Sequence, residues 1–154
     1  MSVTRLCSGC LTGLLFLACG PDVVYQEEVE LPATGWPYAD SLTFTFPVTD
    51  TSGRYDLVLT VAHTADFPYQ NFYVHLDTHL PSGMLRSQPL SLQLADTFGD
   101  WYGDCSGGVC RTDISLQEGT RFTEVGEHRL VVGQFSRDAV LGEVTGMGFR
   151  VVRR

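Results

Sequence analysis

The stretch Phe72-Tyr73-Val74-His75-Leu76-Asp77-Thr78-His79-Leu80 alternates between a more apolar and a more polar set of side chains. Successive side chains of a β-strand point to opposite faces, so this period of two predicts a strand with one buried face. Residues 42–48, 55–61 and 147–152 show the same alternation. Runs rich in Pro, Gly, Asp, Asn and Ser separate these segments, as turns do.

About eight or nine strands of this kind can be traced along the chain, among them short ones at 114–116 and 121–122. Residues 97–108 are expected to form a loop, and residues 136–145 one helical turn, because they lack alternation. Pro47 interrupts the strand at 42–48 and predicts that this strand lies at an edge or carries a bulge. The sequence therefore predicts an all-β fold, a single-domain antiparallel β-sandwich of jelly-roll type.

The composition is that of a globular protein, with 44% hydrophobic residues among 154 and 18% charged ones. This length suits one domain. The formal net charge is −8, and Lys is absent. Nucleic acids are poor partners for such a chain, because phosphate contacts need clustered Lys and Arg.

Residues 1–18 have the order of an export signal. Arg5 precedes an apolar run from Leu11 to Ala18 that is too short to span a bilayer. The run ends in Leu17-Ala18-Cys19, which resembles a bacterial lipobox. The resemblance implies removal of the leader and acylation of Cys19, and two or three acyl chains hold a small domain firmly. A plain secretory signal that leaves a free Cys19 thiol is the alternative.

These features divide the chain into a signal peptide at 1–18, an anchor and tether at 19–22 and a β-sandwich at 23–154. At about 3.3 Å per residue, the tether holds the domain about 10 Å from the lipid. Gly20 follows the cysteine, where Asp would have indicated inner-membrane retention. We therefore expect a cell-envelope protein at the outer membrane that faces the periplasm.

The five cysteines fit this scheme. Cys7 and Cys10 leave with the leader, and Cys19 takes the lipid. Cys105 and Cys110 remain, separated by Ser-Gly-Gly-Val, and an oxidising compartment would permit a disulfide between them. A metal site is the alternative, but two thiolates need two further ligands, and none is adjacent.

No nucleophile elbow, zinc-protease motif, phosphate loop or dinucleotide motif is present, so we expect no catalytic residue, no metal and no cofactor. His75, Asp77 and His79 share one side of a strand and could hold a transition metal. The alternative, which the prediction of no metal follows, is the solvated face of an amphipathic strand. Oxygen ligands in a loop can bind Ca²⁺, but turn composition also explains the three candidates: Asp96, Asp100 and Asp104.

Aromatic residues gather in the predicted loops. Exposed aromatics anchor protein partners or stack on sugars; the alternative is that they fold back and cap the sandwich. The candidate contact residues are Phe67, Pro68, Tyr69, Trp101 and Tyr102, and Trp36-Pro37-Tyr38 forms a similar group.

Several segments, in order along the whole mature chain, resemble the gliding-motility lipoprotein GldH family of Bacteroidota. They are Val24-Tyr25-Gln26-Glu27, Asp66-Phe67-Pro68-Tyr69-Gln70-Asn71-Phe72-Tyr73-Val74, Pro81-Ser82-Gly83, Leu94-Ala95-Asp96, Gly99-Asp100-Trp101-Tyr102-Gly103, Leu141-Gly142-Glu143-Val144 and Gly146-Met147-Gly148-Phe149-Arg150-Val151.

The resemblance implies a structural or interaction protein of the gliding machinery, linked to type IX secretion, with other envelope proteins of that machinery as partners and no enzymatic activity. Two features depart from the family pattern. Tyr102 stands where the family has Leu, and the loop with Cys105 and Cys110 is not a family feature. A cell-envelope carbohydrate-binding module that uses Trp101 and Tyr102 is the alternative function.

Overall fold

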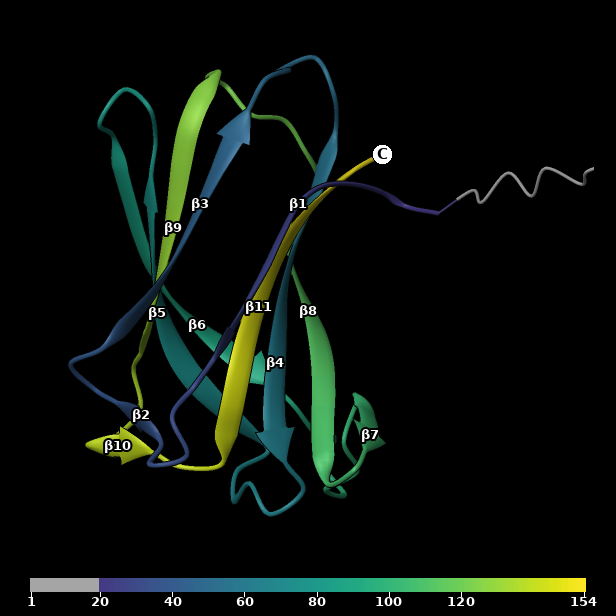
Figure 1. The fold of residues 1–154 in the computed structure, drawn as a ribbon, viewed down its shortest axis with the longest axis vertical. Helices are drawn as coiled ribbons and strands as arrows, with labels where there is room; N and C mark the ends of the chain where they lie inside the picture. The colour runs from purple at the N-terminus through teal and green to yellow at the C-terminus, as the bar shows by residue number, and fades with distance from the viewer. Residues whose placement is uncertain (1–19) are drawn as a thin grey trace, which may run out of the picture.

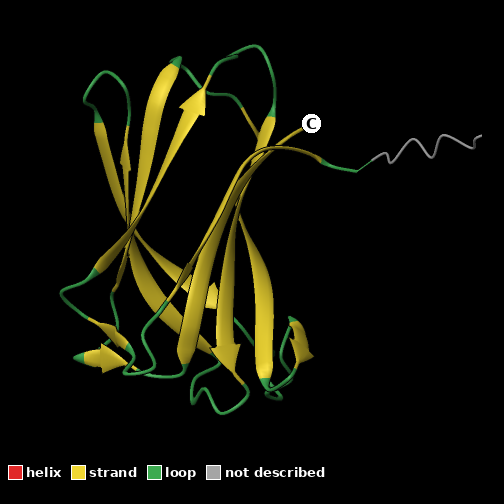
Figure 2. Cartoon of the chain, viewed as in Figure 1, coloured by secondary structure: helices red, strands yellow, loops and turns green. Residues whose placement is uncertain are grey.

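The computed structural model describes residues 20–154; the predicted signal peptide and Cys19 lie outside the described residues. Within that range the chain forms eleven strands and no helix (Figure 2). The strands are β1 (Asp22–Glu30), β2 (Trp36–Pro37), β3 (Ser41–Val48), β4 (Tyr55–Thr64), β5 (Asn71–His79), β6 (Leu85–Gln93), β7 (Asp104–Ser106), β8 (Val109–Thr120), β9 (Gly126–Gln134), β10 (Val140–Leu141) and β11 (Val144–Arg153).

The strands build two antiparallel sheets that face each other (Figure 1). One sheet has the order β1-β11-β4-β8-β7 and the other the order β3-β9-β5-β6, while β2 pairs with β10. Among the eight long strands, every connection crosses from one sheet to the other, except the β5–β6 hairpin. This alternation is the topology of a jelly roll, so the predicted fold class is confirmed.

The alternating apolar side chains fill the space between the sheets. Phe44 and Phe46 of β3 meet Phe149 of β11 with ring centroids 5.8 and 5.3 Å apart. In β5, Phe72, Val74 and Leu76 are buried, as their spacing predicts. Because β3 is an edge strand of its sheet, Pro47 removes no central hydrogen bond, which confirms its predicted edge position.

Three local expectations were wrong. Residues 136–145 form no helical turn; Val140 and Leu141 instead pair with Pro37 and Trp36, and a two-residue bridge is too short to alternate. No strand covers residues 121–122, because β8 continues to Thr120 as one twelve-residue strand. The expected loop at 97–108 contains β7, which forms a hairpin with β8.

The connections divide between the two ends of the sandwich. Residues 49–54, 80–84 and 121–125 connect strands at the end where β1 begins and β11 finishes, which we call the N-terminal end (Figure 1). Residues 31–40, 65–70, 94–108 and 135–143 gather at the opposite end, which we call the distal end. Both segments that carry the predicted contact residues therefore lie at the same end of the molecule.

Candidate functional site

The predicted contact residues at the distal end differ in exposure. The Phe67 side chain is only 4% exposed and contacts the Phe72 ring at 5.8 Å, so it belongs to the core. Its assignment as a contact residue is corrected, because a buried ring offers no surface to a partner. Pro68, Tyr69 and Tyr102 are exposed.

Trp101 is half-buried and contacts the His63 ring edge-on, with centroids 4.5 Å apart. An isolated bridge between Trp101 and Ala95 closes the loop that carries it. Trp36 is fully buried, and its Nε1 donates a hydrogen bond to the Asp40 carbonyl oxygen at 2.9 Å. Both tryptophans therefore cap the core at this end.

Tyr69 and Tyr38, both noted in the sequence, belong to a larger group of exposed aromatics, to which the structure adds Tyr73 and Phe135. Backbone hydrogen bonds join Tyr38 to the segment before Val140, and Phe135 to Tyr73. The Tyr69 hydroxyl donates to Asp138 at 3.0 Å, which links two of the distal connections. We call this group the distal aromatic surface; its members are Tyr38, Tyr69, Tyr73 and Phe135, each about half exposed.

Phe98 projects from a separate, tightly turned loop. Its side chain is 89% exposed, the highest value among the large apolar residues named as exposed. The Asp96 carboxylate accepts hydrogen bonds from the backbone N–H groups of Phe98 and Asp100, at 2.8 and 3.0 Å. Asp96 thus acts as an Asx-turn residue that fixes the loop around Phe98.

The distal end is strongly acidic. Its connections carry seven carboxylates and a single arginine, Arg137. No arginine or histidine of residues 20–154 forms an ion pair with any of the seven. The carboxylates are Asp40, Asp66, Asp96, Asp100, Asp104, Asp138 and Glu143.

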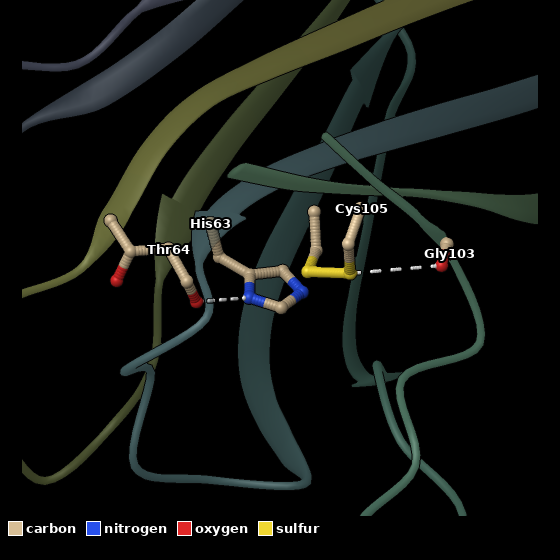
Figure 3. Close-up of a disulfide and its surroundings, with 5 residues drawn as sticks. His63, Thr64, Gly103 and Cys105 are labelled. Atoms are coloured by element: carbon tan, nitrogen blue, oxygen red, sulfur yellow. Dashed lines mark hydrogen bonds between the residues drawn. A yellow bond between two sulfur atoms is a disulfide. The ribbon is translucent and has the colours of Figure 1, made fainter. Parts of the chain in front are cut away.

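A disulfide joins Cys105 of β7 to Cys110 of β8, which face each other across the hairpin (Figure 3). Gly107 and Gly108 form the turn with φ values of 61° and 82°, and a turn with two such residues favours glycine. Cys105 is exposed, whereas Cys110 is fully buried. The bond therefore fixes an exposed hairpin to the core sheet.

Within residues 20–154, neither of the two sets of side chains considered as metal ligands forms a cluster. His75 Nδ1 lies 3.3 Å from the Asp77 carboxylate, as a half-buried contact along one strand. The three loop aspartates do not converge, since Asp96 binds the backbone of its own loop. Across residues 20–154, no three His, Cys, Asp or Glu side chains come together in a way that could hold a metal ion.

No helix within residues 20–154 is long and apolar enough to cross a bilayer. Fold and surface together define the class of this protein as a single-domain jelly-roll β-sandwich with an acidic, aromatic end. Within that class, the family described as GldH lipoprotein matches residues 23–151. The chain therefore belongs to the GldH lipoprotein family, which confirms the resemblance.

Two relatives match nearly the full length. The chain is 25% identical, over 147 residues, to a gliding motility lipoprotein GldH homolog of Christiangramia forsetii, covering 91% of this chain and 90% of the relative. It is 22% identical, over 151 residues, to the gliding motility lipoprotein GldH of Flavobacterium johnsoniae, covering 94% and 93%.

Two solved structures resemble the chain more distantly. The carbohydrate-binding module CBM28, specific for non-crystalline cellulose, gives a TM-score of 0.43 at 12% identity, covering 84% of this chain and 72% of that one. Dimeric latent PorU from Porphyromonas gingivalis gives a TM-score of 0.34 at 15% identity, covering 86% of this chain and 13% of that one.

Proposed function

We propose that this chain is a lipid-anchored, non-catalytic component of the gliding-motility machinery, which acts by binding another protein of the envelope. The observation that carries the proposal is membership of a lipoprotein family whose match spans residues 23–151, with relatives named for gliding motility. The family is described as a lipoprotein family and not by an enzymatic activity, which supports the non-catalytic part of the proposal. A link to type IX secretion, which the resemblance implies, is part of the proposal.

The anchor in this proposal is Cys19, acylated after removal of residues 1–18. Gly20 and Pro21 are exposed and lead directly into β1 at the N-terminal end of the sandwich. That end would face the bilayer, at the periplasmic side of the outer membrane. The nine residues of β1 span about 30 Å at 3.3 Å each, so the distal end would stand well away from the lipid.

The distal aromatic surface is the proposed contact with the partner. Tyrosines and other aromatic side chains dominate the energetics of protein interfaces, and four of them are exposed here on segments that hydrogen bonds connect. The seven carboxylates of the distal connections complement a positively charged partner. We therefore expect the partner to present Arg or Lys, and the association rate to fall as salt is added.

The anchor is tested by genetic complementation. A strain that lacks the gene should lose surface spreading, and the wild-type gene should restore it. A Cys19→Ser protein, present in equal amount by immunoblot, should not restore spreading, because it lacks acyl chains. Normal spreading in either strain would contradict the proposal, as would an unmodified Cys19 in the mass spectrum of the mature wild-type protein.

The partner surface is tested by crosslinking in the native envelope, followed by mass spectrometry. A Tyr69→Ala, Phe135→Ala double variant should lose the crosslinked partner and spreading while keeping its fold by circular dichroism. The matched control is Met84→Ala, Val125→Ala, which removes exposed apolar side chains at the N-terminal end and should behave as wild type. If both variants crosslink to the partner equally well, the distal aromatic surface is not the contact with the partner.

A further inference from the structure

The two long edges of the sandwich are unequal. Along one edge β1 and β3 come together across the two sheets. Along the other edge, a hollow of about 300 Å³ opens between β6 and β8, a volume at the lower end of the range for ligand pockets. We call it the β6–β8 cleft. Eight of its lining side chains are apolar, and we call these its floor: Phe46, Leu57, Leu76, Leu80, Leu116, Phe122, Leu130 and Phe149. Polar side chains also line the cleft: Thr78, Ser87, Gln88, Gln117, Thr120, Thr123 and His128.

Arg86 lies on the inner side of the edge strand that borders this cleft. In the β5–β6 ladder it stands opposite Thr78, and Gln88 stands opposite the buried Leu76. Residues opposite each other in a ladder share a face, so Arg86 and Gln88 occupy the core-facing side of β6. Leu90 and Leu92, which follow them in the strand, lie on the same side. Polar residues at core-facing positions are exceptions that often mark functional sites.

Arg121 contributes a second guanidinium to the cleft, from the connection that follows β8. No carboxylate lines the cleft. Within residues 20–154, neither Arg86 nor Arg121 forms an ion pair. Arg150, Arg153 and Arg154, by contrast, are each paired with an aspartate. Arg54, Arg129 and Arg137 also form no ion pair within residues 20–154, so what distinguishes Arg86 and Arg121 is their position beside the apolar side chains of the cleft.

The chemistry of the cleft selects a narrow class of ligand. An apolar floor takes a hydrocarbon chain, and guanidinium groups bind carboxylate or phosphate oxygens through charge-assisted hydrogen bonds. The cleft includes the start of β6 and the connection 121–125, both at the N-terminal end of the sandwich. This is the end at which Gly20 emerges.

We propose that the β6–β8 cleft binds a single acyl chain that carries an anionic head group, with the chain on the apolar floor and the head group at Arg86 and Arg121. The proposal does not depend on the partner surface at the distal end. All eleven strands and the whole buried core lie within residues 20–154, so a chain that begins at Gly20 keeps the complete sandwich. It can therefore be tested without its own lipid.

The test is a fluorescence titration with dansyl-labelled undecanoic acid, followed by displacement with dodecanoate or dodecyl phosphate below their micelle concentrations. We expect saturable binding and displacement by both anions, but not by dodecanol or dodecyltrimethylammonium. An Arg86→Gln, Arg121→Gln variant should bind the probe about tenfold more weakly, because its charged contacts are lost. Thr78→Trp, which fills the cleft, should also weaken binding, whereas Arg137→Gln, at the distal end, should not.

Three results would overturn the proposal: no saturable binding, equal affinity in the two cleft variants and wild type, or displacement by dodecanol as effective as by dodecanoate. Circular dichroism establishes that each variant is folded. If the arginine variant self-associates but binds the probe with unchanged affinity, the role of Arg86 is instead to keep the edge strand β6 from pairing with a strand of another molecule. None of these results bears on whether the distal surface binds a partner.

Discussion

His63 of β4 lies directly opposite Cys110 of β8, and its ring is turned toward the Cys105–Cys110 disulfide (Figure 3). Its Nδ1 is 2.8 Å from the Thr64 carbonyl oxygen, which only accepts, so the neutral ring carries its proton on Nδ1. The buried Nε2 has no hydrogen-bond partner among residues 20–154. Protonation of His63 would therefore place an uncompensated charge against the disulfide.

This arrangement predicts a loss of stability in mild acid. Burial holds the pKa of His63 below its usual value of 6.5. As the pH falls below 6.5, His63 of the unfolded chain takes up a proton while His63 of the folded chain does not. The free energy of unfolding therefore decreases. Urea unfolding at about pH 7.5 and about pH 5.5 should show a smaller decrease for His63→Phe than for wild type. Equal decreases would show that His63 does not titrate differently on folding.

The disulfide should stabilise the fold modestly. It closes a short loop, with a sequence separation of 5, so its removal is expected to cost about 2 kcal/mol. Thermal unfolding should show a lower Tm for Cys105→Ser, and a reductant should bring wild type to the same Tm. The variant itself should not respond to the reductant. A wild-type Tm that is insensitive to complete reduction, verified by thiol titration, would contradict this.

Phe67 and Tyr69 should differ in their effect on stability, although both were predicted as contact residues. Phe67→Ala removes a buried ring and should lower the free energy of unfolding by about 3 kcal/mol or more. Tyr69→Ala removes an exposed ring and an exposed hydrogen bond to Asp138, and should cost less than about 1 kcal/mol. Chemical denaturation of both variants measures the difference. Similar costs would place Phe67 outside the core.

Gly103 is expected to tolerate no side chain. A Cβ at this position would lie 2.1 Å from the Arg111 carbonyl oxygen of β8, and backbone cannot move aside easily. Gly103→Ala should therefore cost about 2 kcal/mol or more and disturb the loop that carries Trp101. Gly142→Ala is the matched control, because no atom lies within 4 Å of its Cβ position. Equal melting temperatures for the two variants would refute the close contact.

Some of these features follow from the sequence alone. The alternation in residues 72–80 is a local property, since each strand needs only its own side chains to define a buried and an exposed face. Pro47 likewise restricts its strand by lacking an N–H group. The all-β class, the edge position of β3 and the proximity of Cys105 to Cys110 could all be predicted for this reason.

Other features were beyond local patterns. Arg86 lies on the inner face only because it pairs with Thr78 of β5, just as Gln88 pairs with the buried Leu76. The available signal was the two-residue period itself, which places Arg86 and Gln88 on the same face as Leu90 and Leu92. The sequence indicated Tyr38 and Tyr69 as loop aromatics, but their grouping with Phe135 had no local signal, because the three come from separate connections.

The sequence by itself determined the all-β class and the apolar face of long strands such as β5, because a side chain's polarity and the two-residue period act within one segment. Only the tertiary structure decided that Phe67 is buried while Tyr69 is exposed, and that Gly20 and the distal aromatics occupy opposite ends. Both outcomes depend on pairing between residues far apart in the chain. That pairing is set by packing across two sheets, which no single segment encodes.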